Sequence, residues 1–179
     1  DARFRNAADR SGLLEAAYDV VESEIGPLLV ATTDRGVLRI SFDADPEAHL
    51  EAIGQAVGSR VLRAPSAIDE IRRELDQYFA GHRRVFDLSL DLRGQPEFSV
   101  RVLDELARVP FGETATYGDL AARVGSPKGA RAVGLVMNRN PIPIVLPCHR
   151  IVGASGSLTG YAGGLHVKEH LLRLEGVIL

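Results

Sequence analysis

The single cysteine of the sequence, Cys148, lies in the segment Pro147-Cys148-His149-Arg150. Cysteine reacts as the thiolate, which a nearby base or positive charge favours. His149 supplies a base and Arg150 adds positive charge. Because adjacent side chains need not face each other, we expect His149 to act on the thiol through a water molecule. The alternative is a buried, inert cysteine that packs as a small hydrophobic residue; the proline-fixed Cys-His-Arg segment favours the reactive interpretation.

A carboxylate that orients the imidazole would complete a relay of the kind found in catalytic triads. The last helix expected, residues 165–175, places Lys168, Leu172 and Glu175 on one stripe. Glu175 lies at its C-terminal end, where the helix dipole disfavours negative charge. A catalytic or buried pairing role would explain that cost. The alternative is a solvated surface carboxylate.

Residues 153–164 form a glycine-rich segment that follows the cysteine. Glycine permits sharp turns and exposed backbone amides, which can bind a base edge or an anion. The alternative is a flexible surface loop.

The segment His166-Val167-Lys168-Glu169-His170 matches the H-x-x-E-H pattern of some zinc peptidases. Both histidines would share one helix face, but no clear third ligand is present. A single cysteine also excludes an internal disulfide and a cysteine zinc cluster. We therefore expect no bound metal at these residues.

Residues 116–138 have the pattern of two short helices joined by a tight turn. Thr116 is expected to cap the first helix with Asp119 as its capping-box partner, and Ser126 to cap the second, with Pro127 in its first position. The second helix carries small residues and one long side chain, Arg131. Such a helix suits a narrow groove and recognition of DNA shape rather than of base edges. The alternative is an ordinary packed helical hairpin.

The distribution of charge also indicates that the region of the two short helices contacts nucleic acid. The chain of 179 residues has a net charge of −3, which argues against a general polyanion binder. Residues 120–168 nevertheless contain no Asp or Glu and have six basic residues: Arg123, Lys128, Arg131, Arg139, Arg150 and Lys168. A basic face on an acidic protein is a candidate phosphate-binding surface. The alternative is a solvated patch.

The remaining pattern predicts an α+β fold with two domains. Strands are expected at residues 18–22, 28–32, 36–42 and 85–92, and helices at 46–57, 66–80 and 98–109. The break at Arg93-Gly94-Gln95-Pro96 divides an N-terminal α/β domain, residues 1–94, from a mainly helical domain, residues 95–179. The chain has no apolar tract that could cross a bilayer, and residues 1–12 lack the apolar core of a signal peptide, so we expect a cytoplasmic protein without a membrane partner.

The second half of the chain resembles the O6-alkylguanine-DNA alkyltransferases, also called methylated-DNA–protein-cysteine methyltransferases. The matching residues are Pro110-Phe111-Gly112-Glu113, Thr116-Tyr117, Arg131-Ala132-Val133-Gly134, Asn138 to Pro141, Pro147-Cys148-His149-Arg150, Gly160-Tyr161, Gly163-Gly164-Leu165 and Lys168-Glu169. The first half fits the variable N-terminal domain of that family only loosely.

The resemblance implies suicidal DNA repair, in which one alkyl group passes irreversibly from O6-alkylguanine in duplex DNA to Cys148. It leaves open whether alkylated thymine is also a substrate. His149 would be the base, Glu175 would orient it, and Asn140 would brace the turn. Tyr117, Ile151, Tyr161, Ala162 and Lys168 would bind the base, which must be flipped out of the duplex. The second of the two short helices would lie in the minor groove, and Arg131 would fill the hole that the flipped base leaves in the duplex. The DNA-binding residues would be Arg131, Ala130, Ala132, Gly134 and Thr116.

Three departures from the family pattern accompany the resemblance. Ala162 stands where some relatives have serine, which bears on inhibitor preference. Leu135 stands where relatives can have glycine, which bears on the fit to the groove. The cysteines that hold structural zinc in some relatives are absent.

We expect a monomer. The competing interpretations are a lesion sensor or transcriptional regulator, which Cys148 argues against, and a cysteine hydrolase, which would turn over repeatedly.

Overall fold

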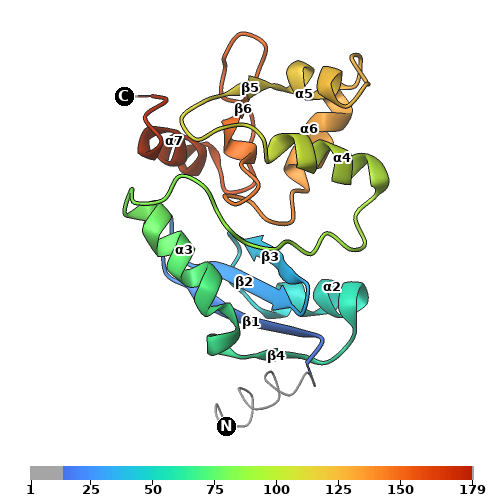
Figure 1. Cartoon of the computed structure of the whole chain (residues 1–179), viewed down its shortest axis with the longest axis vertical. Coiled ribbons are helices and arrows are strands. Elements are labelled where there is room, and N and C mark those ends of the chain that lie inside the picture. The colour runs from blue at the N-terminus through green and yellow to red at the C-terminus, as the bar shows by residue number, and fades with distance from the viewer. Residues whose placement is uncertain (1–13, 179) are drawn as a thin grey trace. The chain divides into compact units, whose positions relative to one another are not determined.

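The computed structural model describes residues 14–178, so the interpretation of residues 1–12 lies outside the described part of the chain. The chain divides between Gly94 and Gln95 into two compact units. The first combines a small sheet with helices and the second is mainly helical (Figure 1). The predicted mixed α/β fold is therefore confirmed.

The first unit is built on a four-stranded sheet in the order β3-β2-β1-β4. Its strands are β1 (Ala16–Val21), β2 (Leu28–Thr33), β3 (Gly36–Ser41) and β4 (Val61–Arg63). The first three form an antiparallel meander in which Val20 pairs with Leu29, whereas β4 runs parallel to β1. The short turns around Gly26 and Gly36, both with positive φ, allow the chain to reverse between these strands.

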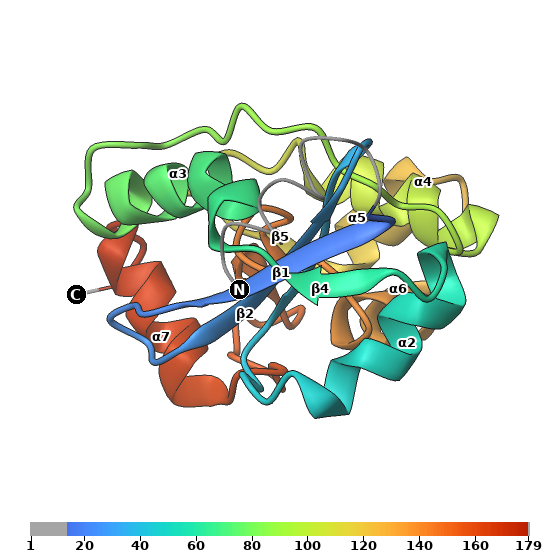
Figure 2. The same ribbon diagram turned by 90° about the horizontal axis from the view of Figure 1, so that it is seen from below.

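Helices cover both faces of this sheet (Figure 2). On one face Ile53 of α2 (Glu47–Val57) packs against Leu29 and Ala31. On the other face lie the 3-10 helix η1 (Pro65–Ile68) and α3 (Asp69–Phe79). The buried carboxylate of Asp19 joins β1 to this layer.

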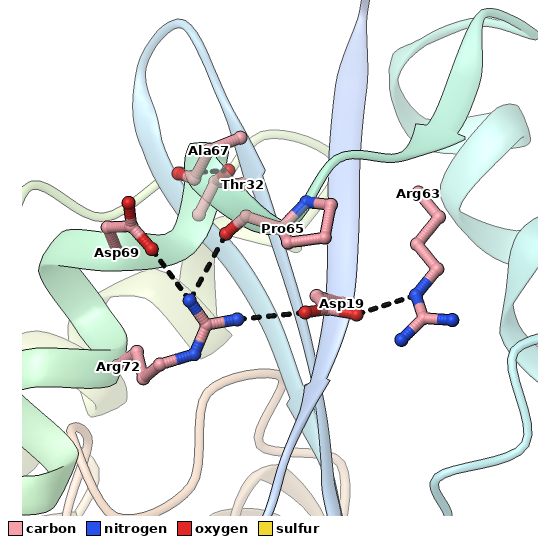
Figure 3. Close-up of polar contacts among 7 residues, drawn as sticks. All are labelled: Asp19, Thr32, Arg63, Pro65, Ala67, Asp69 and Arg72. Atoms are coloured by element: carbon pink, nitrogen blue, oxygen red, sulfur yellow. Dashed lines mark hydrogen bonds and ion pairs between the residues drawn. The ribbon is translucent and has the colours of Figure 1, made fainter. Parts of the chain in front are cut away.

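Figure 3 shows the ion pairs that Asp19 makes. One carboxylate oxygen accepts a hydrogen bond from Arg63 Nε at 2.7 Å, and the other accepts one from Arg72 Nη2 at 2.8 Å. Arg72 Nη1 also donates to Asp69 Oδ1 at 2.6 Å. The two guanidinium groups compensate the burial of the Asp19 charge, so this layer is fixed by polar contacts as well as by apolar packing.

The structure differs from the sequence-based expectation at two places in the first unit. Residues 85–92 do not form a strand, because they make only one isolated bridge, between Leu90 and Val37. The alternation of half-buried and exposed side chains that suggested a strand is present up to Leu90, yet only two backbone hydrogen bonds join the segment to β3. The strand β4 was not expected, because its three partly exposed residues are too few to show the alternation of apolar and polar side chains that predicts a strand.

The second unit consists of helices around a minimal two-stranded sheet. Its elements are α4 (Glu97–Leu106), β5 (Ala115–Thr116), α5 (Tyr117–Arg123), α6 (Ala130–Asn138), the 3-10 helix η2 (Cys148–Arg150), β6 (Ile151–Val152) and α7 (Leu165–Leu174). The helices α4, α5 and α6 pack on one another, and α7 packs on η2. The parallel pairing of β5 with β6 places the start of α5 beside the residues that follow Cys148.

The predicted pair of short helices is present as α5 and α6, with one correction. Thr116 caps α5, and its hydroxyl and the Asp119 carboxylate form the expected capping box. Ser126 does not cap the second helix. Residues 126–129 form a turn in which the Gly129 N–H donates to Ser126 O at 2.7 Å, and α6 begins at Ala130 with Gly129 as its N-cap.

Candidate active site

Cys148 follows a turn that is built largely from apolar residues and braced by the side-chain amide of Asn140. Asn140 Nδ2 donates to Leu146 O at 2.8 Å, and Asn140 Oδ1 accepts from Ile142 N at 3.0 Å. Between these contacts Ile144 is held at a φ of 74°, a conformation that a β-branched residue rarely adopts. The Asn140 side chain thus holds a strained backbone that leads into Pro147 and Cys148.

Cys148 is buried, with 4% of the residue exposed. Burial raises the pKa of the Cys148 thiol, because the thiolate would lose its hydration. Contacts with Asn140 and Tyr161 and the positive charge of Lys168 oppose this shift without cancelling it. The resting thiol is therefore protonated at pH 7, and its reaction requires a base.

His149 is the base that the turn supplies. Its ring is fully buried, and Nε2 lies 2.7 Å from Glu175 Oε1. Burial lowers the pKa of His149, and the hydrogen bond with Glu175 only partly opposes that. A neutral ring that donates its Nε2 proton to the carboxylate leaves Nδ1 as an acceptor. Nδ1 is buried and has no hydrogen-bond partner among the described residues.

Glu175 is the C-cap residue of α7 and is buried. Besides His149, it accepts hydrogen bonds from Arg150 Nε and Nη2, both at 2.9 Å, and from Gly112 N at 3.2 Å. Burial alone would raise the pKa of the Glu175 carboxyl, but His149 and Arg150 outweigh it and lower the pKa to about 2. This buried pairing offsets the unfavourable position of Glu175 at the end of a helix.

The structure corrects the role expected of Arg150. Its guanidinium binds the Glu175 carboxylate through Nε and Nη2 and donates from Nη1 to Val109 O at 2.6 Å. The positive charge that opposes the rise in the pKa of the Cys148 thiol comes from Lys168. Sequence adjacency had suggested Arg150, because the side chain of Lys168 reaches the cysteine only through the packing of α7 on η2.

Lys168 is buried in α7, and burial lowers the pKa of its ammonium. Its Nζ donates to Ile151 O at 2.5 Å and to Thr159 O at 3.3 Å. The Thr159 hydroxyl lies 2.8 Å from the Tyr117 hydroxyl. Of the residues expected to bind a base, Tyr117, Ile151 and Lys168 are thus linked to one another through the glycine-rich loop.

The two remaining expected base contacts lie in a turn at the end of this loop. Tyr161 is half-buried and contacts the Cys148 thiol, and its carbonyl accepts a hydrogen bond from Gly164 N at 2.9 Å. Ala162 is exposed. Ala162 therefore lies on the exposed side of this turn.

The expected DNA-binding residues form a separate group on α6. Arg131 and Ala132 are exposed and Ala130 is half-buried. Gly134 faces Tyr117, whose ring lies 3.9 Å from the place of a side chain at that position. Thr116 is not part of α6. It is the N-cap residue of α5, and its hydroxyl is already bound within the capping box with Asp119.

The basic segment is less uniform than its sequence suggests. Arg150 and Lys168 are buried inside the site, whereas four cations are exposed: Arg123, Lys128, Arg131 and Arg139. These four lie on α5, on α6 or in the segments that follow them, so the exposed charge is concentrated beside the two short helices.

A metal site is not found at the H-x-x-E-H segment. Within residues 14–178, no group of three or more His, Cys, Asp or Glu side chains is arranged to hold a metal ion. None of the helices in the same range is long and apolar enough to cross a membrane.

Three contributors to the site were missed from the sequence. Phe111 lies under the Arg150 guanidinium, with 5.8 Å between the guanidinium carbon and the ring centroid, and the Gly112 N–H binds Glu175. Thr159 connects Tyr117 with Lys168. The Pro110-Phe111-Gly112 motif could have pointed to the first two, but nothing in the glycine-rich segment singles out Thr159.

Comparison with known proteins extends over both units. Residues 97–177 match the model for the DNA-binding domain of 6-O-methylguanine DNA methyltransferase, and residues 16–92 match its ribonuclease-like domain. The chain belongs to the 6-O-methylguanine DNA methyltransferase family. This membership confirms the resemblance noted above and the enzyme class, methyltransferases that act on methylated DNA and a protein cysteine.

Similar members of the family include proteins from archaea and bacteria. The methylated-DNA–protein-cysteine methyltransferase of Mycolicibacterium paratuberculosis is 53% identical, with 88% of this chain and 91% of that protein covered. That of Methanosarcina acetivorans is 42% identical, with coverage of 89% and 97%. The crystal structure of Mycobacterium tuberculosis OGT in complex with DNA is similar with a TM-score of 0.77 and 40% identity, and covers 89% of this chain and 92% of its own.

Proposed function

We propose that this protein repairs O6-alkylguanine in duplex DNA by moving the alkyl group onto Cys148, once per molecule. The observation that carries the proposal is that Cys148, His149 and Glu175 are all buried and that His149 binds Glu175. One imidazole nitrogen of His149 is bound to the carboxylate, and the other has no hydrogen-bond partner among the described residues. Family membership supports the substrate class.

The thiol must lose its proton to react, and the neutral His149 is placed to take it. A water molecule between Cys148 Sγ and His149 Nδ1 would carry the proton, since the two residues are adjacent in the chain and Nδ1 has no other hydrogen-bond partner among the described residues. The imidazolium that results is stabilised by the Glu175 carboxylate, which stays ionised because its pKa is about 2.

The thiolate then attacks the alkyl carbon in line with the bond to guanine O6. The S–C bond forms as the C–O bond breaks, and the electron pair remains on the guanine, which leaves as an anion and is protonated. The Ala162 backbone amide and the Tyr117 hydroxyl are the donors we assign to the guanine, where they would stabilise the charge that develops. The thioether has no facile reverse reaction, so the protein reacts once and needs no cofactor.

Residues 95–179 are the part of the chain to which we assign DNA binding. The target base lies inside the duplex and must be extruded before Cys148 can reach it. The small residues Ala130, Ala132 and Gly134 would let α6 approach the backbone of the minor groove, and the exposed Arg131 would occupy the space that the base vacates. The exposed cations beside α5 and α6 favour contact with phosphates. We expect the protein to act as a monomer.

The stoichiometry of repair distinguishes this proposal from its rivals. Protein at limiting concentration is mixed with excess duplex that contains O6-methylguanine, and the restored guanine is measured over time. One guanine per protein molecule followed by no further reaction is the expected result. Continued turnover would indicate a hydrolase, and binding of the duplex without restored guanine would indicate a lesion sensor.

A further inference from the structure

Thr159 joins the helix pair α5 and α6 to the buried lysine beside Cys148. Its hydroxyl lies 2.8 Å from the hydroxyl of Tyr117, the first residue of α5. Its carbonyl accepts from Lys168 Nζ, which also holds the carbonyl of Ile151. Thr159 therefore contacts Tyr117 through its side-chain hydroxyl and Lys168 through its backbone carbonyl.

Its position in the loop is fixed from both sides. Lys168 is fully buried and binds the backbone on either side of the segment between Ile151 and Thr159. Within that segment Gly153 N donates to Ser157 O at 2.9 Å, and the Thr159 methyl group packs at 3.5 Å from the place of a side chain on Gly153. With the methyl directed to Gly153, the hydroxyl of Thr159 is directed to Tyr117.

We propose that Thr159 is a positioning residue that presents the phenolic hydrogen of Tyr117 to the target nucleotide; this inference rests on the function proposed above. Either hydroxyl of the pair can be the donor. If Thr159 donates to the phenolic oxygen, the proton of Tyr117 remains available for an acceptor on the nucleotide. Donation in the other direction would commit that proton to the protein. Because Tyr117 also faces Gly134 of α6, its ring is held between the helix pair and the loop.

The test measures the rate constant of alkyl transfer from an O6-methylguanine duplex at saturating DNA. Thr159→Val keeps the shape of the side chain and removes the donor, so we expect a reduction of about 3- to 10-fold, the range that corresponds to one hydrogen bond. Thr159→Ser restores the donor and should recover most of the rate. Ser155→Ala is the matched control, because Ser155 is exposed in the same loop. The Lys168 contact is to a backbone carbonyl and survives all these changes.

A double-mutant cycle separates positioning of Tyr117 from a general effect on the loop. In the Tyr117→Phe background, Thr159→Val should cause no further loss, since the hydroxyl it serves is gone. The same loss in both backgrounds would overturn the inference, as would an unchanged rate in Thr159→Val. If the valine variant does not fold, Thr159→Ala replaces it in both backgrounds with the same expectations. Absence of transfer by the unaltered protein would refute the proposed function itself, before any variant is compared.

Discussion

Replacement of Glu175 by glutamine is the perturbation that bears most on the buried centre. The two carboxylate oxygens accept four hydrogen bonds, and every one comes from an N–H donor. Glutamine has nearly the same shape, but one of its two terminal atoms is an NH₂ donor. Whichever way the amide is turned, that donor faces two other donors, and Arg150 loses its buried counter-charge.

The size of the effect follows from the ionisation of Glu175. Its pKa is about 2 in the folded protein, against an ordinary value of 4.5. This difference corresponds to about 3 kcal/mol of stability at pH 7. The figure agrees with the roughly 3 to 5 kcal/mol lost when one partner of a buried ion pair is removed. We therefore expect Glu175→Gln to lower the free energy of unfolding by about 3 kcal/mol at pH 7.

The lowered pKa of Glu175 also determines how its contribution to the free energy of unfolding changes with pH. A carboxyl with a lowered folded-state pKa contributes its full stability above its ordinary pKa of 4.5, and that contribution is lost as the pH falls toward 2. At pH 3 it should have dropped to roughly 1.4 kcal/mol. The gap between the unaltered protein and the variant should therefore narrow from pH 7 to pH 3.

Urea denaturation at several pH values measures this gap. The matched control is Glu169→Gln in the same helix, where the carboxylate is partly exposed and lies 3.9 Å from Arg173. The control should change stability by less than about 0.5 kcal/mol. The reasoning is refuted if Glu175→Gln is as stable as the control, or if its deficit is the same at pH 3 as at pH 7.

Three further predictions concern DNA, proton transfer and the loop. Arg131→Ala should slow repair in duplex DNA by about tenfold or more and leave the reaction with free O6-benzylguanine nearly unchanged, with the exposed Arg73→Ala as control; equal losses on both substrates would contradict the assigned role. Because burial lowers the pKa of His149, the rate of alkyl transfer should stay level between pH 7 and pH 9 and decline only below pH 6.5, whereas a tenfold rise per pH unit would indicate a thiolate formed without the base. Lys168→Met leaves the buried Ile151 carbonyl and the half-buried Thr159 carbonyl without their donor. It should cost about 2 to 4 kcal/mol and speed hydrogen exchange in residues 153–160, while Lys128→Met at an exposed position should do neither.

Local signals in the sequence account for much of the fold. The meander strands, the helices and the capping box at Thr116 depend on contacts within a few residues. There sequence reasoning was correct, apart from the start of α6, which Ser126 does not cap. It was wrong for residues 85–92, where the alternating pattern was real but the hydrogen-bonding partner was not available over the full length. It missed β4 because that strand depends on a partner, β1, that lies about 45 residues earlier in the chain.

The site shows the same division between local and distant contacts. The proximity of Cys148 and His149 can be read from their adjacency, and the odd position of Glu175 at a helix end indicated a buried partner. The destination of the Arg150 side chain could not be read in this way, because its partners, Glu175 and Val109, are distant in sequence. The Thr159 contact was hidden for the same reason, since a threonine in a glycine-rich loop carries no sign of what it touches.

The measurement that tests the central claim most directly is the location of the transferred group. The protein and its Cys148→Ala variant are each incubated with duplex DNA that contains O6-methylguanine, and intact and digested samples are examined by mass spectrometry. The account predicts one methyl group on the unaltered protein, on the peptide that contains Cys148, and none on the variant, while both bind the duplex. A methyl group on another residue, or guanine restored without any adduct, would contradict it.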